Sequence, residues 1–318
     1  MLTVLLTHEP GIRRGLRQCF YSDRVNRRNI LNSNTTMLEV NDANPNNNKH
    51  NDNTRRDYVT EPKISKATRD NTSFNDKSIS VVYWNVNGLG DMLGEPDVIS
   101  LLNKYDVIVM SETMKRPTFK VSFTGYTSYH YPHERQSFYK NRAPGGFIVL
   151  VKNLIANKCV IVKQDAHVVW LHLKHASKRS NDYFIGCVYL PHEKSTLKKI
   201  DHFESLQNDV LNFKSKGNVI IFGDTNSRTG NLDDYTSSSS HDNMNYILND
   251  LYDVSSRQNC DSLINSHGKK LILFCKETGM QIQNGRFGSS SNRFTCYRYN
   301  GKSQIDYLIT YPSVTRNI

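Results

Sequence analysis

The fold of this chain is indicated most clearly by residues 219–228, which read Val219-Ile220-Ile221-Phe222-Gly223-Asp224-Thr225-Asn226-Ser227-Arg228. The four consecutive apolar residues of this stretch predict a fully buried strand, and the glycine that follows predicts the end of that strand. Asp224 and Asn226 then come two positions apart. Ligands of open α/β sheets bind outside the carboxyl ends of the strands, so this pair is suited to a water molecule or a phosphate oxygen. A strand that runs into an Asx turn explains the segment equally well when it is taken alone.

Similar apolar runs recur from residue 79 onward, with few helical patterns between them. This arrangement predicts an α/β fold in which two packed β-sheets are flanked by helices, rather than a strict βαβ repeat. Helices are expected at residues 96–105, 197–213 and 269–278. The expected strands are residues 79–84, 107–110, 147–151, 159–163, 168–173, 183–189, 219–222, 281–282, 294–297 and 305–310.

Five polar side chains with oxygen ligands stand at the ends of four of these strands. Such oxygen atoms suit Mg²⁺ or Mn²⁺, and Mg²⁺ is typically held by one or two carboxylates together with water and substrate phosphate. Each residue also has a structural explanation, such as a turn cap or an exposed charge. Their repetition at strand ends favours a shared site. The residues are Asn85, Glu112, Asp224, Asn226 and Asp306.

The first 78 residues have a different composition and predict a disordered, basic and Asn-rich N-terminal region. Residues 31–53 contain nine asparagines and almost no large apolar side chains. Such a segment cannot bury enough surface to offset the entropy lost on ordering. The folded domain is therefore expected to cover residues 79–318.

Composition narrows the class of partner. The formal net charge is +11, which favours a polyanion such as nucleic acid, although many basic proteins are merely soluble. No apolar run approaches the roughly 18 residues of a membrane span, so no membrane partner is expected. The six cysteines form no CxxC pair, which argues against a zinc site and favours a reducing, intracellular compartment. The sequence indicates no small-molecule cofactor and leaves the oligomeric state open.

Six ordered motifs resemble those of the endonuclease/exonuclease/phosphatase superfamily. The resemblance covers about residues 79–312 and is greatest to the endonuclease domain of non-LTR (LINE-type) retrotransposons and to craniofacial development protein 2-like sequences. It implies a four-layer α/β sandwich and hydrolysis of phosphodiesters with Mg²⁺ or Mn²⁺. The motifs are residues 84–89 (Trp-Asn-Val-Asn-Gly-Leu), 111–113 (Ser-Glu-Thr), 144–146 (Pro-Gly-Gly), 189–191 (Tyr-Leu-Pro), 223–228 (Gly-Asp-Thr-Asn-Ser-Arg) and 303–307 (Ser-Gln-Ile-Asp-Tyr).

The resemblance also implies a role for each matching residue. Glu112 is the expected principal metal ligand, with Asn85 and Asn87 beside it. Asp224 is expected to orient or deprotonate the attacking water. The other implied roles are contact with the scissile phosphate for Tyr189, water and phosphate binding for Asn226, orientation of a histidine for Asp306, and substrate binding for Asn85 and Arg228.

One motif of the family is not found. The family carries a Ser-Asp-His motif shortly after the strand that contains Asp306, whereas this sequence continues for only twelve residues beyond Asp306 without it. A domain that lacks its C-terminal end is therefore expected, as a fragment of a longer reading frame or as a decayed copy.

Three functions stay open on the sequence. They are a DNA endonuclease of retroelement origin, a phosphomonoesterase or inositol-phosphate phosphatase of the same superfamily, and an inactive module that binds DNA or protein. DNA is the leading partner, and a DNA substrate favours the nucleus. Basic residues such as Lys115, Arg116 and Lys120 are candidate phosphate contacts, and a solvated charged surface explains them equally well.

Overall fold

The computed structural model describes residues 2–6, 79–132, 145–175, 181–192, 201–236, 257–286, 293–298 and 301–315. All three helices and all ten strands expected from the sequence overlap elements of the structure, although some of their bounds differ. Within the N-terminal region, β1 (Leu2–Leu6) is a strand, which differs from the expectation that residues 1–78 are disordered. The rest of that prediction concerns residues outside the described ranges.

The first sheet has the strand order β1-β2-β3-β5-β4. Strands β1, β2 (Ile79–Asn85) and β3 (Val107–Ser111) run parallel to one another. β5 (Phe147–Lys152) pairs antiparallel with β3, and β4 (Tyr126–Tyr131) pairs antiparallel with β5. The sheet is therefore mixed. β4 was not expected from the sequence because its polar and aromatic residues are mostly half-buried and show no apolar run.

The second sheet has six strands in the order β10-β13-β9-β8-β7-β6. Its parallel pair is β8 with β9, and its other pairs are antiparallel. A separate two-stranded hairpin joins β11 to β12. The bounds are β6 (Cys159–Gln164), β7 (Val168–Leu173), β8 (Tyr183–Tyr189), β9 (Asn218–Asp224), β10 (Gln281–Ile282), β11 (Cys296–Arg298), β12 (Gly301–Ser303) and β13 (Asp306–Thr310).

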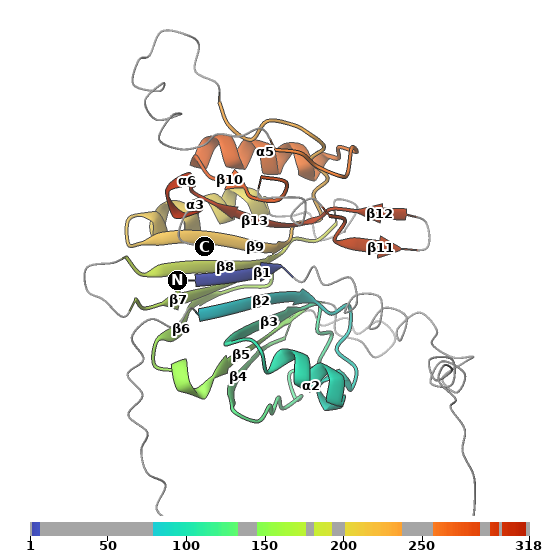
Figure 1. The fold of residues 1–318 in the computed structure, drawn as a ribbon, viewed down its shortest axis with the longest axis vertical. Helices are drawn as coiled ribbons and strands as arrows, with labels where there is room; N and C mark the ends of the chain where they lie inside the picture. Colours follow the sequence, from blue (N-terminus) through green and yellow to red (C-terminus); the bar gives the residue numbers. More distant parts are fainter. Residues whose placement is uncertain are drawn as a thin grey trace, which may run out of the picture. The chain divides into compact units, whose positions relative to one another are not determined.

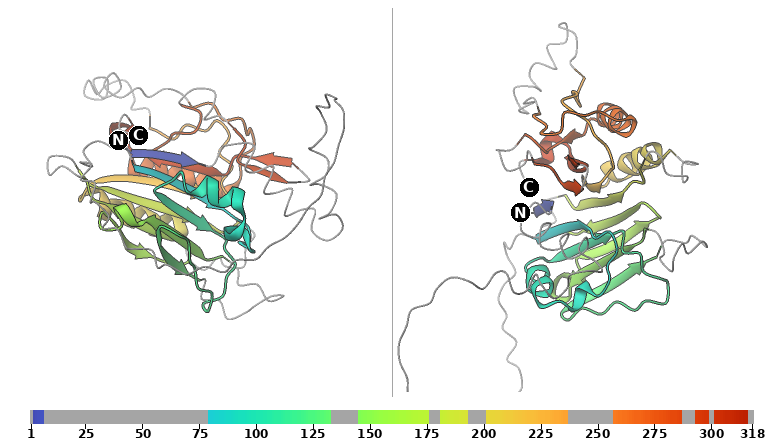
Figure 2. Two further views of the ribbon diagram at one scale, coloured as in Figure 1. Left: turned by 60° about the horizontal axis from the view of Figure 1, so that its bottom comes forward. Right: turned by 90° about the vertical axis from the view of Figure 1, so that its right-hand side faces the viewer.

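The two sheets pack face to face and bury one hydrophobic core between them. Val81 and Val109 from the first sheet share this core with Leu171, Ile220 and Phe222 from the second. A second core lies on the outer face of the second sheet, where α3 (His202–Lys214) and α5 (Ser266–Thr278) pack. Figures 1 and 2 show α2 (Pro96–Leu102) on the outer side of the first sheet. The α/β fold with two mixed sheets flanked by helices confirms the expected fold class.

Capping residues set where the helices begin. Asp201 caps α3 by accepting a hydrogen bond from Phe203 N at 3.1 Å, which places its start five residues later than the apolar spacing predicted. Asn265 caps α5 through Gly268 N at 2.7 Å, three residues earlier than predicted. Shorter elements are the 3₁₀ helices η1 (Met92–Gly94) and η2 (Asn153–Ile155) and the helix α6 (Pro312–Thr315).

Candidate active site

The strand register brings the predicted site residues to one edge of the sandwich. Tyr189 of β8 and Asp306 of β13 both pair with Asp224 of β9, so the three lie side by side across the second sheet. Side chains alternate along a strand, and Ile220 and Phe222 of β9 face the core between the sheets. Asp224 therefore faces the first sheet at the end of that core. The same alternation turns Asn85 toward the second sheet, since Tyr83 of β2 belongs to this core.

Asp224 is held by both of its carboxylate oxygens. Asn85 Nδ2 donates to Asp224 Oδ2 at 2.9 Å and joins the two sheets across the site. Asn226 N donates to Asp224 Oδ1 at 2.9 Å, while Asn226 Nδ2 donates to Leu190 O at 2.8 Å. Asn226 is thus placed to position Asp224, and its amide nitrogen is engaged with the chain that follows β8.

The Tyr189 hydroxyl donates a hydrogen bond to Glu112 Oε1. Burial raises the pKa of Tyr189, and the nearby Glu112 carboxylate adds to the rise. The phenol consequently stays protonated and available as a donor. Glu112 follows β3 directly, so this contact also joins the two sheets.

Residues with positive φ gather at this edge. Within the described ranges, the non-glycine residues with positive φ are Asn87, Glu112, Met114 and Asn226, with φ between 48° and 53°. Such conformations are sparsely populated and persist only when the surroundings hold them. Three of the four were predicted as site residues from the sequence. Backbone hydrogen bonds hold them, including Gly88 N to Glu112 O at 2.7 Å and Met114 N to Gly145 O at 2.9 Å.

The site is strongly acidic at its buried end. Asp224 is 5 % exposed and Asp306 is 3 % exposed. Burial raises the pKa of Asp224 well above its ordinary value, and the charges of Asp306 and Glu112 raise it further. The Tyr83 phenol lies beside these carboxylates and bonds to Ser111 Oγ at 2.6 Å. The sequence showed Tyr83 only as a strand residue, with no signal for this position.

Two asparagines that the sequence did not assign to the site support it from behind. Asn265 Nδ2 donates to Asn226 O at 3.0 Å, and Asn265 Oδ1 accepts from Arg228 N at 2.9 Å. Asn284 Nδ2 donates to Asp306 O at 3.1 Å, and Asn284 Oδ1 accepts from Leu308 N at 2.9 Å. An asparagine that precedes a helix can be recognised as an N-cap, but the helix expected from the sequence began at residue 269, and a cap does not reveal the second contact.

Two residues that were expected to contact substrate or phosphate, Arg228 and Lys115, contact other protein groups in the structure. The Arg228 guanidinium forms a two-pronged pair with buried Asp261, at 2.8 Å from Nε and 2.6 Å from Nη2. The Arg228 guanidinium, which was expected to bind substrate, is therefore paired with Asp261. Lys115 Nζ donates to Gly90 O at 2.7 Å and lies over the Phe119 ring.

The residues present fit a magnesium site with few protein ligands. Among the described residues, no group of three histidine, cysteine, aspartate or glutamate side chains is arranged to enclose a metal ion. Mg²⁺ commonly binds one or two carboxylates and completes its shell with water and phosphate. Glu112 provides such a carboxylate. Asn85 Oδ1 accepts from Asn87 N at 3.0 Å, and a carbonyl oxygen keeps a second lone pair for a cation. Asn87 is exposed beside it.

Solved structures that are similar to this chain include NExo, described both as a 3' phosphatase and as a 3'-5' exonuclease, and the catalytic domain of APE2. The 3' phosphatase NExo from Neisseria, bound to a product DNA hairpin, has a TM-score of 0.49 at 12 % identity and covers 74 % of this chain and 88 % of its own. The catalytic domain of Xenopus laevis APE2 has a TM-score of 0.47 at 16 % identity and covers 74 % of this chain and 83 % of its own. No match was found among the curated proteins.

The family model described as the endonuclease/exonuclease/phosphatase family matches residues 82–317. These residues include both sheets except β1 and the first strand residues of β2, and they include every residue of the candidate site. The match spans well over half of the chain. This protein belongs to the endonuclease/exonuclease/phosphatase family.

Proposed function

We propose that this protein is a divalent-metal-dependent phosphodiesterase that cleaves the DNA backbone and descends from a retroelement endonuclease. One observation carries the proposal. Glu112, Tyr189, Asp224 and Asn85 converge from four strands on one edge and form two hydrogen-bonded pairs, each of which joins the two sheets. Asp306 lies beside Asp224 in the adjacent strand. A set of acceptors and donors spread over both sheets is suited to holding a phosphate and a water between them.

Asp224 is the proposed general base. A base works best when its pKa lies near the operating pH, and burial raises the pKa of Asp224 in that direction. The hydrogen bonds from Asn85 and Asn226 fix the carboxylate in place while it accepts a proton from the attacking water. Asn226 acts through Asp224 and is therefore a positioning residue.

Glu112 and Tyr189 form the proposed phosphate side of the site. A divalent cation bound at Glu112 would offset the charge that develops on the phosphate. Tyr189 holds Glu112 in its orientation and stays protonated, so its hydroxyl is a donor at neutral pH. Asn87, at the exposed end of the site, is the proposed supplementary ligand.

DNA is the proposed substrate because the chain is basic as well as a member of this family. The net charge of +11 favours a polyanion, and neutralisation of backbone phosphates by lysine and arginine makes binding sensitive to salt. The forms of residues 223–228 and 303–307 favour the retroelement branch over the phosphatases.

The test is nicking of supercoiled plasmid DNA with Mg²⁺, with EDTA as a control and with release of phosphate from inositol phosphates measured in parallel. Nicking that needs the metal and is lost in Glu112→Gln supports the proposal. Phosphate release without nicking would identify a phosphatase instead. DNA binding without either reaction would identify a binding module.

A further inference from the structure

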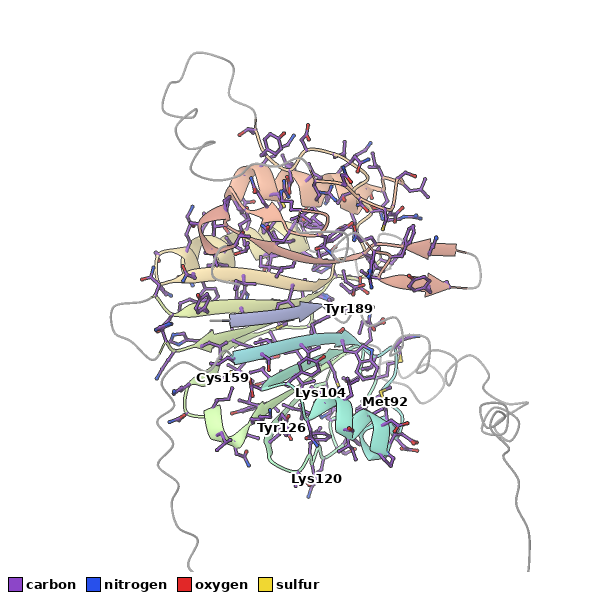
Figure 3. All side chains as sticks on the ribbon, viewed as in Figure 1. Met92, Lys104, Lys120, Tyr126, Cys159 and Tyr189 are labelled. Carbon is purple, nitrogen blue, oxygen red and sulfur yellow. The ribbon has the colours of Figure 1, made fainter. Side chains whose placement is uncertain are left out.

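A basic hairpin projects from the edge that carries the candidate site. β11 and β12 pair antiparallel, with Cys296 opposite Ser303 and Arg298 opposite Gly301. Figures 1 and 3 show this hairpin extending beyond the ends of β9 and β13, on the side of the sandwich where Tyr189 lies. Its strands lead directly into β13, which begins at Asp306.

The base of the hairpin is fixed to the site. Thr295 Oγ1 accepts hydrogen bonds from Ile305 N and Asp306 N, each at 3.1 Å, and Thr295 is fully buried. Gln304 N donates to Asp261 Oδ2 at 3.0 Å. The position of the hairpin relative to Asp306 is therefore set by several buried contacts rather than by the turn alone.

Alternation along β11 directs Arg298 toward the domain. Cys296 is 5 % exposed, whereas Tyr297 is 47 % exposed and lies on the opposite face of the hairpin. Arg298 shares the face of Cys296 because residues two apart in a strand point the same way. Its cross-strand neighbour is Gly301, which has no side chain to cover the guanidinium. Arg298 is nevertheless exposed, so its charged end is accessible to a ligand.

The positive charge of Arg298 affects the electrostatics of the candidate site. The pKa of its guanidinium is raised, mainly by Cys296, and the Asp224 and Glu112 carboxylates raise it further. Burial dominates the raised pKa of the Tyr189 phenol, and Arg298 is a cation that opposes this rise. These charge effects agree with the position of the hairpin, which carries Arg298 on the side of the sandwich where the candidate site lies.

We propose that Arg298 binds the reacting phosphate from the hairpin side, opposite Glu112. A guanidinium presents a planar fork of donors that matches two phosphate oxygens, and such charge-assisted pairs are among the stronger hydrogen bonds. This inference rests on the proposed phosphodiesterase function. It adds a substrate-binding residue that lies outside the motifs identified in the sequence.

The experiment compares Arg298→Gln and Arg298→Lys with Lys302→Gln in the full chain. Lys302 is a matched control because it lies on the same hairpin and carries the same charge, while its ammonium packs over the Phe294 ring at 4.4 Å. Two substrates are used, namely supercoiled plasmid DNA and bis(p-nitrophenyl) phosphate, which contains a single phosphodiester. Thermal unfolding of each variant verifies that the fold is intact.

Arg298→Gln is expected to lower kcat/KM for both substrates by about 10- to 100-fold, the range for losing a hydrogen bond to a charged group. The kcat/KM of Arg298→Lys should lie between those of the wild type and Arg298→Gln, because lysine keeps the positive charge but lacks the planar pair of donors. Lys302→Gln should change the small substrate little. Removal of Arg298 should also reduce the slope of the logarithm of the DNA-binding constant against the logarithm of salt concentration by about one.

The outcomes separate this proposal from the function on which it rests. A wild-type chain inactive on both substrates would overturn the phosphodiesterase proposal and this one with it. An active wild type in which Arg298→Gln equals Lys302→Gln would overturn only the role of Arg298. A loss confined to plasmid DNA would place Arg298 on a flanking phosphate and contradict contact with the reacting one.

Discussion

Replacement of Asn265 should affect both the stability of the fold and the geometry of the site. Asn265 Oδ1 accepts hydrogen bonds from Gly268 N and Arg228 N, and its Nδ2 donates to Asn226 O. In Asn265→Ala, loss of the helix cap costs about 1 kcal/mol. The Arg228 N–H is left without its acceptor, which costs about 1–3 kcal/mol. The free energy of unfolding should therefore fall by about 2–4 kcal/mol.

Asn265→Asp separates the two effects. A carboxylate still accepts from both backbone N–H groups and is favoured near the start of a helix, so stability should change little. Its second oxygen, however, faces Asn226 O where an amide donor stood. The loop that carries Asn226 should shift, and displacement of a positioned group by about 1 Å can cost about 100-fold in rate. We expect plasmid nicking to fall by about 10- to 100-fold.

The assays are urea unfolding followed by circular dichroism and plasmid nicking with Mg²⁺. Asp201→Ala is the control because Asp201 caps α3, a helix of the same length as α5, and contacts Lys270 rather than the site. That variant should lose about 1 kcal/mol of stability and keep its nicking rate. If Asn265→Ala is no less stable than Asp201→Ala, or if Asn265→Asp nicks DNA at the wild-type rate, the reasoning is refuted.

Three further predictions concern the site and its support. Tyr189→Phe removes the donor to Glu112 and should lower the nicking rate by about 10-fold or more without lowering the melting temperature, whereas an unchanged rate would exclude a role for the hydroxyl. Asp306→Asn should lower the pKa of Asp224, because the charge of Asp306 helps burial to raise it, and the acid limb of the nicking pH profile should move to lower pH. The contribution of Asp224 to stability is present at low pH and is lost as the pH rises through its raised folded-state pKa, so this variant should gain melting temperature near neutral pH and little in acid. Gly223→Ala should lower the free energy of unfolding by about 2–4 kcal/mol, because an added Cβ would lie 2.2 Å from Val188 O and the residue has a φ of +142°. Gly94→Ala is the control in the same unfolding assay. It should be neutral because an added Cβ at Gly94 has nothing within 4 Å.

Much of the fold follows from local patterns in the sequence. The bounds of β7, β8 and β10 match the expected strands, and the apolar run before Gly223 is buried within β9. Such runs identify buried strands because their burial needs no information about neighbours. β4 and β12 were missed because they are short or half-buried, and their pairing with other strands defines them instead.

Local patterns in the sequence identify which polar residues follow buried strands, because strand ends and alternation are local properties. Asp224 and Asn226 were placed in this way before any neighbour was known. The tertiary structure decided which of these strand ends meet, and it showed Asn85 bonding to Asp224 from the other sheet. It also paired Arg228 with Asp261 and brought Asn265 behind the site. Such contacts join residues far apart in the chain, so they depend on the order in which the strands pair in the two sheets, which is a property of the tertiary structure.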